Sequence, residues 1–228
     1  MSSKNLTKCP NDTIIEYYHS TGLYNSLIYK EFHPNQNLSK NDQILNLIKK
    51  FKNNAHKFAA TKDNILFSNQ NFNSNIMIIG DMPSLEDENT QNIFSSKIGE
   101  LLDKMLNAIS LSRTNIYLTN ILPFHIQNLK GVYVSQKNLI KKLTHEHIEI
   151  INPKIILILG SFPLEILFDD LHTFTKHRGQ WLSYPTSKKK IDTLCSFHPN
   201  FLLQQPSQKK NSWIDLQAFQ KKIKNFNI

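Results

Sequence analysis

Short runs of apolar residues, each ending in glycine or polar residues, constrain the fold of this chain more than any other feature. Four such runs cover residues 76–80, 116–120, 155–160 and 191–197. The clearest is Ile-Ile-Leu-Ile-Leu-Gly at 155–160. A continuous apolar run of this length is typical of a strand that is buried on both faces of a parallel sheet. The runs therefore predict a short central parallel sheet of about four strands.

Helical periodicity occurs between these runs. Apolar residues recur three and four positions apart in the segments that we interpret as helices, at residues 98–111, 139–151, 162–168 and 212–223. We interpret the intervening segments 126–136 and 184–190 as loops. Because strand and helix alternate, we expect an α/β fold, a three-layer α/β/α sandwich with helices on both faces of the sheet.

The first part of the chain has a different texture. Asp12 or Thr13 is a candidate cap for a short helix, and Ser39 followed by Asp42 predicts the start of a second one. We therefore expect residues 1–70 to form a helical extension packed on an α/β domain of residues 71–228.

The charge of the chain favours an anionic partner. It carries 27 Lys and Arg against 18 Asp and Glu, a formal net charge of +9, with a pI of about 9.4. Nucleic acid and an acidic membrane surface both fit this excess, and so does a lysine-rich, solvated surface with no partner. No apolar run approaches the length of about 18 residues that spans a membrane, so no membrane segment is expected.

The two cysteines, Cys9 and Cys195, are far apart and lack the spacing of a metal site. This pattern predicts no bound metal, no disulfide and a reducing, cytoplasmic location. Residues 1–9 are polar, unlike a secretory signal. We expect a monomer.

Polar residues follow the predicted strands at the edge where parallel α/β sheets bind ligands. They are Gly80-Asp81-Met82-Pro83, Asn120, Gly160-Ser161 and His198-Pro199. An amide can read the donor and acceptor edge of a heterocycle, and a histidine can donate to a developing oxyanion. Each group alone also fits a helix cap or a tight turn. Neither a G-x-G-x-x-G motif nor a P-loop is present.

Six ordered segments between about residues 75 and 216 resemble the uracil-DNA glycosylase superfamily, specifically its bacterial family 4 type. The first is Gly80-Asp81-Met82-Pro83 with Glu86-Asp87-Glu88 and Phe94, followed by the G-x-L-L-D-x-M-L helix at 99–106. The others are I-Y-L-T-N at 116–120, P-K-x-I-x-x-L-G at 153–160, R-G-x-W at 178–181, and H-P-N-F-L-L at 198–203 with W-x-D-L at 213–216.

The resemblance implies a role for each matched residue in excising uracil from DNA. Phe94 stacks on the flipped base, and Asn120 pairs with the pyrimidine edge. His198 donates to the O2 side of the leaving base. Gly80, Met82 and Pro83 line the base, and Asp81 is a candidate catalytic helper.

The same resemblance implies a DNA-binding surface near the C-terminal motif. Leu202 or Leu203 is expected to fill the stack that the base leaves, although each also fits a buried helix start. Gln204, Lys209, Lys210 and Arg178 are the expected contacts to DNA, with the lysines on phosphates.

Several positions depart from the family pattern. Asp81 and Ser84 replace the family's Glu and Gly, and Gln204 replaces an Arg. The loop at 123–130 differs from the family's R-P-P-G-N-R. The four cysteines that bind an iron–sulfur cluster in the family have no counterparts here; the N-terminal pair would fall near residues 56–62 and the fourth near Ile140. We therefore expect no cofactor.

Three functions remain open on the sequence alone. The first is an active, cluster-free uracil-DNA glycosylase whose partner is uracil-containing DNA. The second is a catalytically weak DNA-binding relative, and the third is a base- or nucleotide-binding module. Retention of Phe94, Asn120 and His198 together favours the first.

Overall fold

The computed structural model describes residues 38–58, 65–69, 71–169 and 174–226. Residues 40–228 form one compact unit. The helix predicted to begin at Asp12 or Thr13 lies outside the described residues. The boundary predicted near residue 70 stays a prediction, although the helix at 40–54 belongs to the same unit as the sheet.

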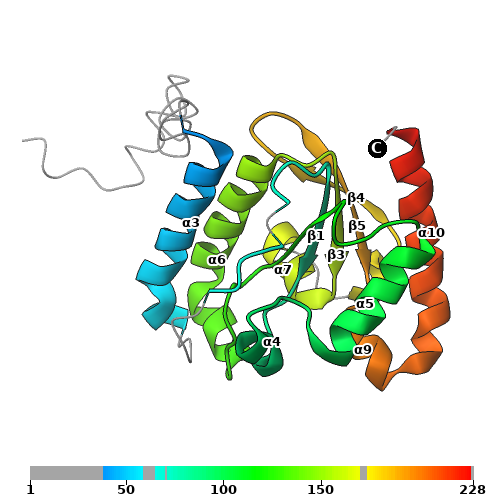
Figure 1. The fold of residues 1–228 in the computed structure, drawn as a ribbon, viewed down its shortest axis with the longest axis horizontal. Helices are drawn as coiled ribbons and strands as arrows, with labels where there is room; N and C mark the ends of the chain where they lie inside the picture. The colour runs from blue at the N-terminus through cyan, green and yellow to red at the C-terminus, as the bar shows by residue number, and fades with distance from the viewer. Residues whose placement is uncertain (1–37, 59–64, 70, 170–173, 227–228) are drawn as a thin grey trace, which may run out of the picture. The chain divides into compact units, whose positions relative to one another are not determined.

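A five-stranded sheet with the order β2-β1-β3-β5-β4 forms the centre of the unit (Figure 1). Its strands are β1 (Ile76–Gly80), β2 (Tyr117–Asn120), β3 (Ile155–Leu159), β4 (Trp181–Pro185) and β5 (Lys190–Ser196). The four strands predicted from the apolar runs are all parallel to one another. The side chains of β1, β2 and β3 are all buried, because helices cover both faces of the sheet, as the continuous apolar runs predict.

The fifth strand, β4, corrects the predicted strand count and the loop assigned to 184–190. It pairs antiparallel with β5 at the sheet edge through a hairpin whose turn is closed by a Thr186 N–H donating to the Lys189 carbonyl at 2.9 Å. Only Tyr184 of this strand is buried. An edge strand needs few apolar residues, so β4 has no apolar run that would identify it.

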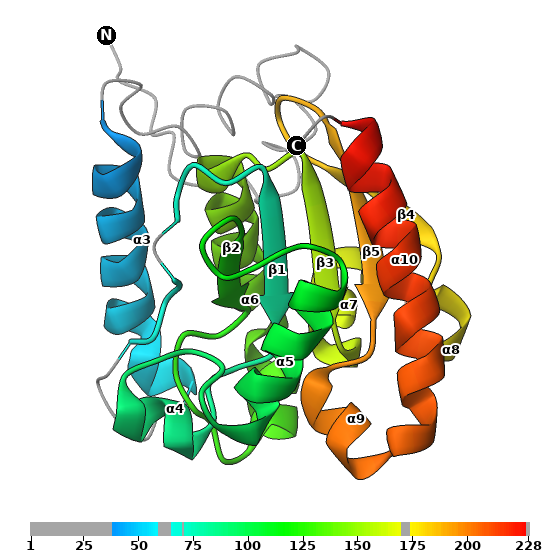
Figure 2. The same ribbon diagram turned by 45° about the vertical axis from the view of Figure 1, so that its right-hand side comes forward.

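Helices on opposite faces of the sheet make the other two layers (Figure 2). One layer contains α3 (Lys40–Asn54), α6 (Leu129–Ile151) and α7 (Ser161–Phe168), and the other contains α5 (Ser96–Ala108) and α10 (Lys209–Asn225). Met77 and Ile79 pack into the first core, whereas Ile76 and Ile78 pack into the second. This alternation confirms the predicted α/β/α sandwich.

Short elements complete the fold and correct some predicted bounds. They are η1 (Ala55–Phe58), α4 (Leu85–Thr90), α8 (Phe174–His177), α9 (Pro199–Gln204) and η2 (Pro206–Gln208). α6 begins ten residues earlier than predicted, at Leu129, because the Asn128 side chain caps it by accepting from the Gly131 N–H at 3.0 Å. In the part of the chain that the structure describes, no helix combines the length and apolarity needed to cross a membrane.

Candidate active site

The ends of the parallel strands bring four loops together, as the topology predicts. Gly80 at the end of β1 is in register with Asn120 at the end of β2. The end of β3 lies beside that of β5, where the Gly160 N–H donates to the Ser196 carbonyl at 2.9 Å. Asp81 and Gly160 directly follow β1 and β3, and His198 lies two residues after the end of β5.

Gly80 has no room for a side chain. A Cβ atom added there would lie 2.4 Å from Cζ of Phe94 and 2.6 Å from Oδ1 of Asn120. Phe94 and Asn120 are 4% and 5% exposed, so the ring and the amide meet over a bare backbone. Glycine is required at this position because only it permits so close an approach.

A second close approach links Asp81 and His198. A Cβ atom added to Gly160 would lie 3.0 Å from Oδ1 of Asp81 and 3.3 Å from Cβ of His198. The φ angle of Gly160 is 102°, which other residues rarely adopt. The rings of His198 and Phe94 are 5.7 Å apart between centroids. We call Gly80, Asp81, Phe94, Asn120, Gly160 and His198 the strand-end site.

Three buried polar atoms of the strand-end site have no hydrogen-bond partner: Oδ1 of Asp81, Oδ1 of Asn120 and Nε2 of His198. A buried polar atom without a partner is costly, and native proteins keep few of them. Such a cluster at the carboxyl edge of a parallel sheet indicates that a polar ligand completes these hydrogen bonds.

His198 is a neutral donor in this arrangement. Burial lowers the pKa of its imidazole to about 4, although the charge of Asp87 raises it in part. Its Nδ1 accepts from the Asn200 N–H at 3.2 Å, which places the single proton of the neutral ring on Nε2. His198 is the N-cap of α9, so the helix fixes the ring orientation.

The pKa of Asp81 is shifted in the opposite direction to that of His198. Burial raises the pKa of its carboxyl to about 7. Near neutral pH this carboxyl is therefore present both as the protonated acid and as the carboxylate. A carboxyl poised in this range is suited to proton transfer at a reacting centre.

The rest of the first motif is held by two buried carboxylates, Asp87 and Glu88, for which the motif match predicted no role. Asp87 closes a capping box with Ser84 at the start of α4. Oε1 of Glu88 accepts from the His125 N–H at 3.0 Å, and Nδ1–H of His125 donates to the Pro83 carbonyl at 3.0 Å. These contacts tie the altered loop at 123–130 to the first motif. The available signal was the spacing of Ser84 and Asp87, which fits a capping box.

Met82 and Pro83 take less polar positions. Met82 is partly buried against the core on the α6 face, and Pro83 is buried. Whether either lines a bound base stays a prediction.

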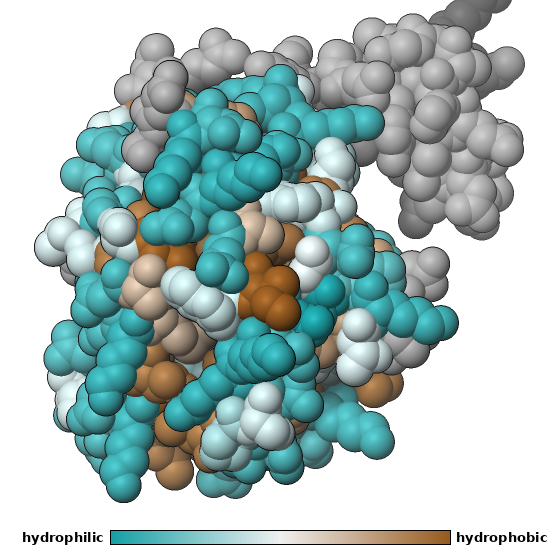
Figure 3. Space-filling view, turned by 90° about the vertical axis from the view of Figure 1, so that its right-hand side faces the viewer, coloured by the Kyte–Doolittle hydropathy of each residue, from teal (hydrophilic) through white to brown (hydrophobic). Residues whose placement is uncertain are grey.

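The structure separates the two leucines of the C-terminal motif. Leu202 is 1% exposed and packs into the core on the α5 face, whereas Leu203 is 39% exposed. Leu202 is thus a core residue rather than a DNA contact, because the turn of α9 directs it inward. Gln204, Lys209 and Lys210 are exposed. The side of the molecule that carries α10 presents mostly hydrophilic side chains, with several hydrophobic patches between them (Figure 3).

Arg178, predicted to contact DNA, is engaged within the protein. Its Nη1 lies 2.5 Å from Oδ1 of Asp215, and Oδ2 of Asp215 accepts from the Ser196 hydroxyl at 2.8 Å. Gly179 lies so close that an added Cβ would be 2.6 Å from Asp215. Arg178 therefore joins the R-G-x-W and W-x-D-L segments, because a buried carboxylate needs a partner.

Comparison with known proteins identifies the family of this chain. Residues 67–221 match the model of the uracil DNA glycosylase superfamily. The chain belongs to this superfamily. It is 28% identical over 147 residues to a type-4 uracil-DNA glycosylase of Thermotoga maritima, covering 64% of this chain and 75% of the relative. It is 24% identical over 172 residues to a type-4 enzyme of Archaeoglobus fulgidus, covering 74% and 85%.

Replacing Gly80 by Ala tests the close approach that organises the site. The added methyl group overlaps Phe94 and Asn120, so we expect Gly80→Ala to lower the free energy of unfolding by about 1–3 kcal/mol. Urea denaturation measures this change, with Asn107→Ala on the exposed face of α5 as the control. Equal stability of the two variants would show that the site is loosely packed.

Proposed function

We propose that this protein is a DNA repair glycosylase that flips uracil out of DNA and hydrolyses its N-glycosidic bond, leaving an abasic site. One observation carries the proposal: the unpartnered Nε2–H of His198 and Oδ1 of Asn120 lie around a buried Phe94 ring. Uracil offers the complementary set, an O2 acceptor and an N3–H donor on a flat face. The relatives are named type-4 uracil-DNA glycosylase, which supports the same activity.

Asn120 gives the proposed selectivity for uracil. Its Oδ1 accepts from N3–H of uracil, and its amide group donates to O4. Cytosine presents an acceptor at N3, so its lone pair would face the Asn120 oxygen and leave that buried atom unpaired. Because that unpaired atom is costly, a site built to bind a substrate N–H rejects an analogue without this N–H.

Base flipping requires compensation for the lost stacking. Extruding a nucleotide costs a few kcal/mol, and stacking on an aromatic ring returns about 1–3 kcal/mol. Phe94 supplies that ring, and the exposed Leu203 is the candidate wedge in the vacated stack. Lys209 and Lys210 stand in the first turn of α10, where a helix amino end and two ammonium groups together favour a DNA phosphate.

His198 stabilises the leaving base. As the bond between C1′ and N1 breaks, its electron pair moves onto the base and negative charge develops at O2. The neutral Nε2–H of His198 donates to that oxygen. A preorganised donor aimed at a developing charge in a buried site supplies a large part of such a rate enhancement.

Asp81 completes the hydrolysis as a carboxylate. Water adds to C1′ through its oxygen, and the proton that it loses passes to Asp81. The departing uracil anion takes its proton from solvent. The unpartnered Oδ1 and the raised pKa of the carboxyl support this role.

We further propose that the protein works without an iron–sulfur cluster. The sequence has two cysteines, and a four-cysteine cluster needs twice as many. Cys195 is buried in β5 with its sulfur 3.7 Å from the Gly160 carbonyl. Near the places of the family's cysteines, Phe58 and Ile140 are fully buried in one apolar core with Phe51 and Phe124. Packing replaces the cluster in holding η1 against α6.

A bacterial source, a cytoplasmic location and a monomeric state stay predictions from the sequence. The preference for single- or double-stranded DNA is an outcome of the next experiment.

The proposed activity is tested with oligonucleotides that carry one uracil. We expect the protein to release uracil from them in the presence of EDTA, so that alkali cleaves the strand at the abasic site. The same oligonucleotide with thymine should stay intact. DNA binding with no strand cleavage at stoichiometric protein would instead identify a catalytically weak DNA-binding relative.

Substitution of the two base-reading residues tests the site. Because each supplies a hydrogen bond to the reacting base, we expect His198→Ala and Asn120→Ala to lower the single-turnover rate at least about tenfold. His56→Ala and Asn107→Ala, at exposed positions of η1 and α5, are the matched controls. Wild-type rates with unchanged thermal stability in both site variants would refute the assignment.

The raised pKa of the Asp81 carboxyl predicts that both the rate and the stability depend on pH. The reactive carboxylate accumulates above its pKa, so kcat/KM should rise through about pH 7, and Asp81→Asn should lose this rise. The pKa of the Asp81 carboxyl is higher in the folded state than in the unfolded state. The unfolded state therefore loses this proton first, and the free energy of unfolding falls as pH rises toward 7. Asp81→Asn should therefore unfold at a higher temperature than the wild type at pH 8. A flat wild-type rate profile would contradict the role.

A further inference from the structure

The backbone that carries the Phe94 ring has an unfavourable conformation. The φ angles of Phe94 and Ser96 are 49° and 66°, in the left-handed region that residues other than glycine seldom adopt. Such a conformation persists only where surrounding contacts enforce it, and it is most frequent at functional sites. The contacts that enforce it here come from outside the segment.

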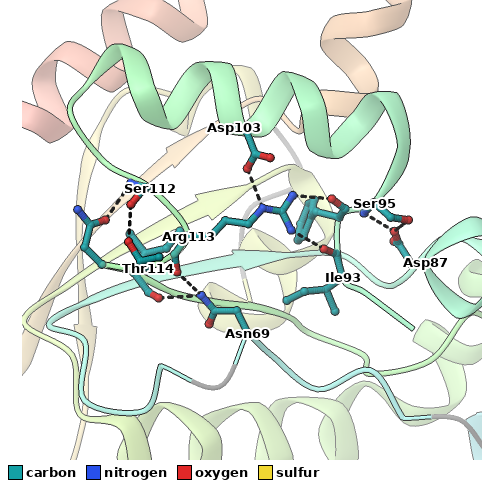
Figure 4. Close-up of polar contacts among 11 residues, drawn as sticks. Asn69, Asp87, Ile93, Ser95, Asp103, Ser112, Arg113 and Thr114 are labelled. Atoms are coloured by element: carbon teal, nitrogen blue, oxygen red, sulfur yellow. Dashed lines mark hydrogen bonds and ion pairs between the residues drawn. The ribbon is translucent and has the colours of Figure 1, made fainter. Parts of the chain in front are cut away.

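Arg113 binds this segment from one side. Its Nη1 donates to the Ile93 carbonyl at 2.8 Å and its Nη2 to the Phe94 carbonyl at 2.6 Å, while its Nε donates to Oδ1 of Asp103 at 2.7 Å. Figure 4 shows the guanidinium extended between Asp103 of α5 and the segment at Ile93. The fork of the guanidinium thus reaches two successive carbonyls and one carboxylate.

Asp87 binds the same segment from the other side. Its Oδ1 accepts from the N–H and from the hydroxyl of Ser95, both at 2.6 Å. The peptide unit between Phe94 and Ser95 is therefore held at its oxygen by a cation and at its nitrogen by an anion. Charge-assisted hydrogen bonds are stronger than neutral ones, so this peptide resists rotation.

The base of the Arg113 side chain is also fixed. Nδ2 of Asn69 donates to the Arg113 carbonyl at 2.7 Å, and Oδ1 of Asn69 accepts from the Leu118 N–H of β2 at 2.9 Å. The arginine is thereby anchored to the strand that ends in Asn120. Gly99 closes the arrangement, because a Cβ added there would lie 1.7 Å from the Phe94 carbonyl oxygen.

We propose that Arg113 is a positioning residue for the reaction: it holds the peptide after Phe94 so that the ring lies flat against the flipped base. This inference rests on the proposed function. The Phe94 ring is bounded by Gly80 and by the His198 ring, so rotation of its peptide would displace the stacking face within a crowded site. Small displacements of a substrate-positioning group cost much of the rate.

A structural ion pair alone does not explain this arginine. The Arg113 and Asp103 side chains are 32% and 44% exposed, and ion pairs at this exposure contribute little to stability. Lysine would retain the charge but not the planar fork that bridges two carbonyls. The chain offers a matched control in Lys222 and Asp192, an ion pair of 34% and 37% exposure joining α10 to β5.

The test compares Arg113→Met and Arg113→Lys with Lys222→Met. We expect Arg113→Met to raise the inhibition constant of free uracil and to lower the single-turnover rate, each by about tenfold, with a smaller effect for Arg113→Lys. Affinity for a duplex with a tetrahydrofuran abasic analogue should match that of Lys222→Met. Wild-type uracil inhibition and rate in Arg113→Met would overturn the inference.

A double-mutant cycle with Phe94→Leu separates positioning from general destabilisation. If Arg113 acts through the ring, adding Arg113→Met to Phe94→Leu causes no further loss of uracil affinity. Additive losses would show that Arg113 acts by another route and would overturn the inference.

Amide exchange at Ser95 tests, without any substrate, whether Arg113 and Asp87 hold the peptide between Phe94 and Ser95. Exchange of this N–H, followed by NMR, should be at least about tenfold faster in Arg113→Met than in Lys222→Met. Wild-type exchange in Arg113→Met overturns the inference. If the wild-type protein neither binds nor releases uracil, the proposed function is refuted instead. The exchange result then still decides whether Arg113 holds the Phe94–Ser95 peptide.

Discussion

The site depends on one steric constraint, the absence of a side chain at Gly80. The Phe94 ring and the Asn120 amide meet over the backbone at the end of β1, where an added Cβ would lie within 2.6 Å of both. The parallel register of β1 and β2 brings Asn120 to this point. The same topology places the loops after β3 and β5 beside it, so Gly160 and His198 join Asp81, which follows β1, without any long-range loop.

The site keeps polar atoms unpartnered at a cost to stability. Burial moves the pKa of His198 down to about 4 and that of Asp81 up to about 7, which gives a neutral donor beside a titratable carboxyl at neutral pH. The surrounding apolar cores supply the compensation, since both faces of the sheet are fully packed. A ligand that forms hydrogen bonds with these atoms recovers part of that cost, which contributes to its affinity.

Among the strands, sequence patterns predicted those that are buried on both faces and missed the one that is not. The four parallel strands follow from continuous apolar runs, but β4 is an edge strand with one buried residue, Tyr184. The early start of α6 depends on the Asn128 cap, which resembles any polar loop residue. Periodicity could not separate Leu202 from Leu203, because adjacent residues at a helix start differ only in which one the tertiary packing covers.

By itself the sequence determined the α/β class, the order of the motifs and the residue types at the strand ends, because these depend on local periodicity and chain order. Only the tertiary structure decided how side chains are used. It paired Arg178 with Asp215 inside the protein, and it placed Arg113 and Asp87 on opposite ends of one peptide beside Phe94. Hydrogen-bond partners far apart in sequence carry no local signal, since their distance is set by the packing of whole elements.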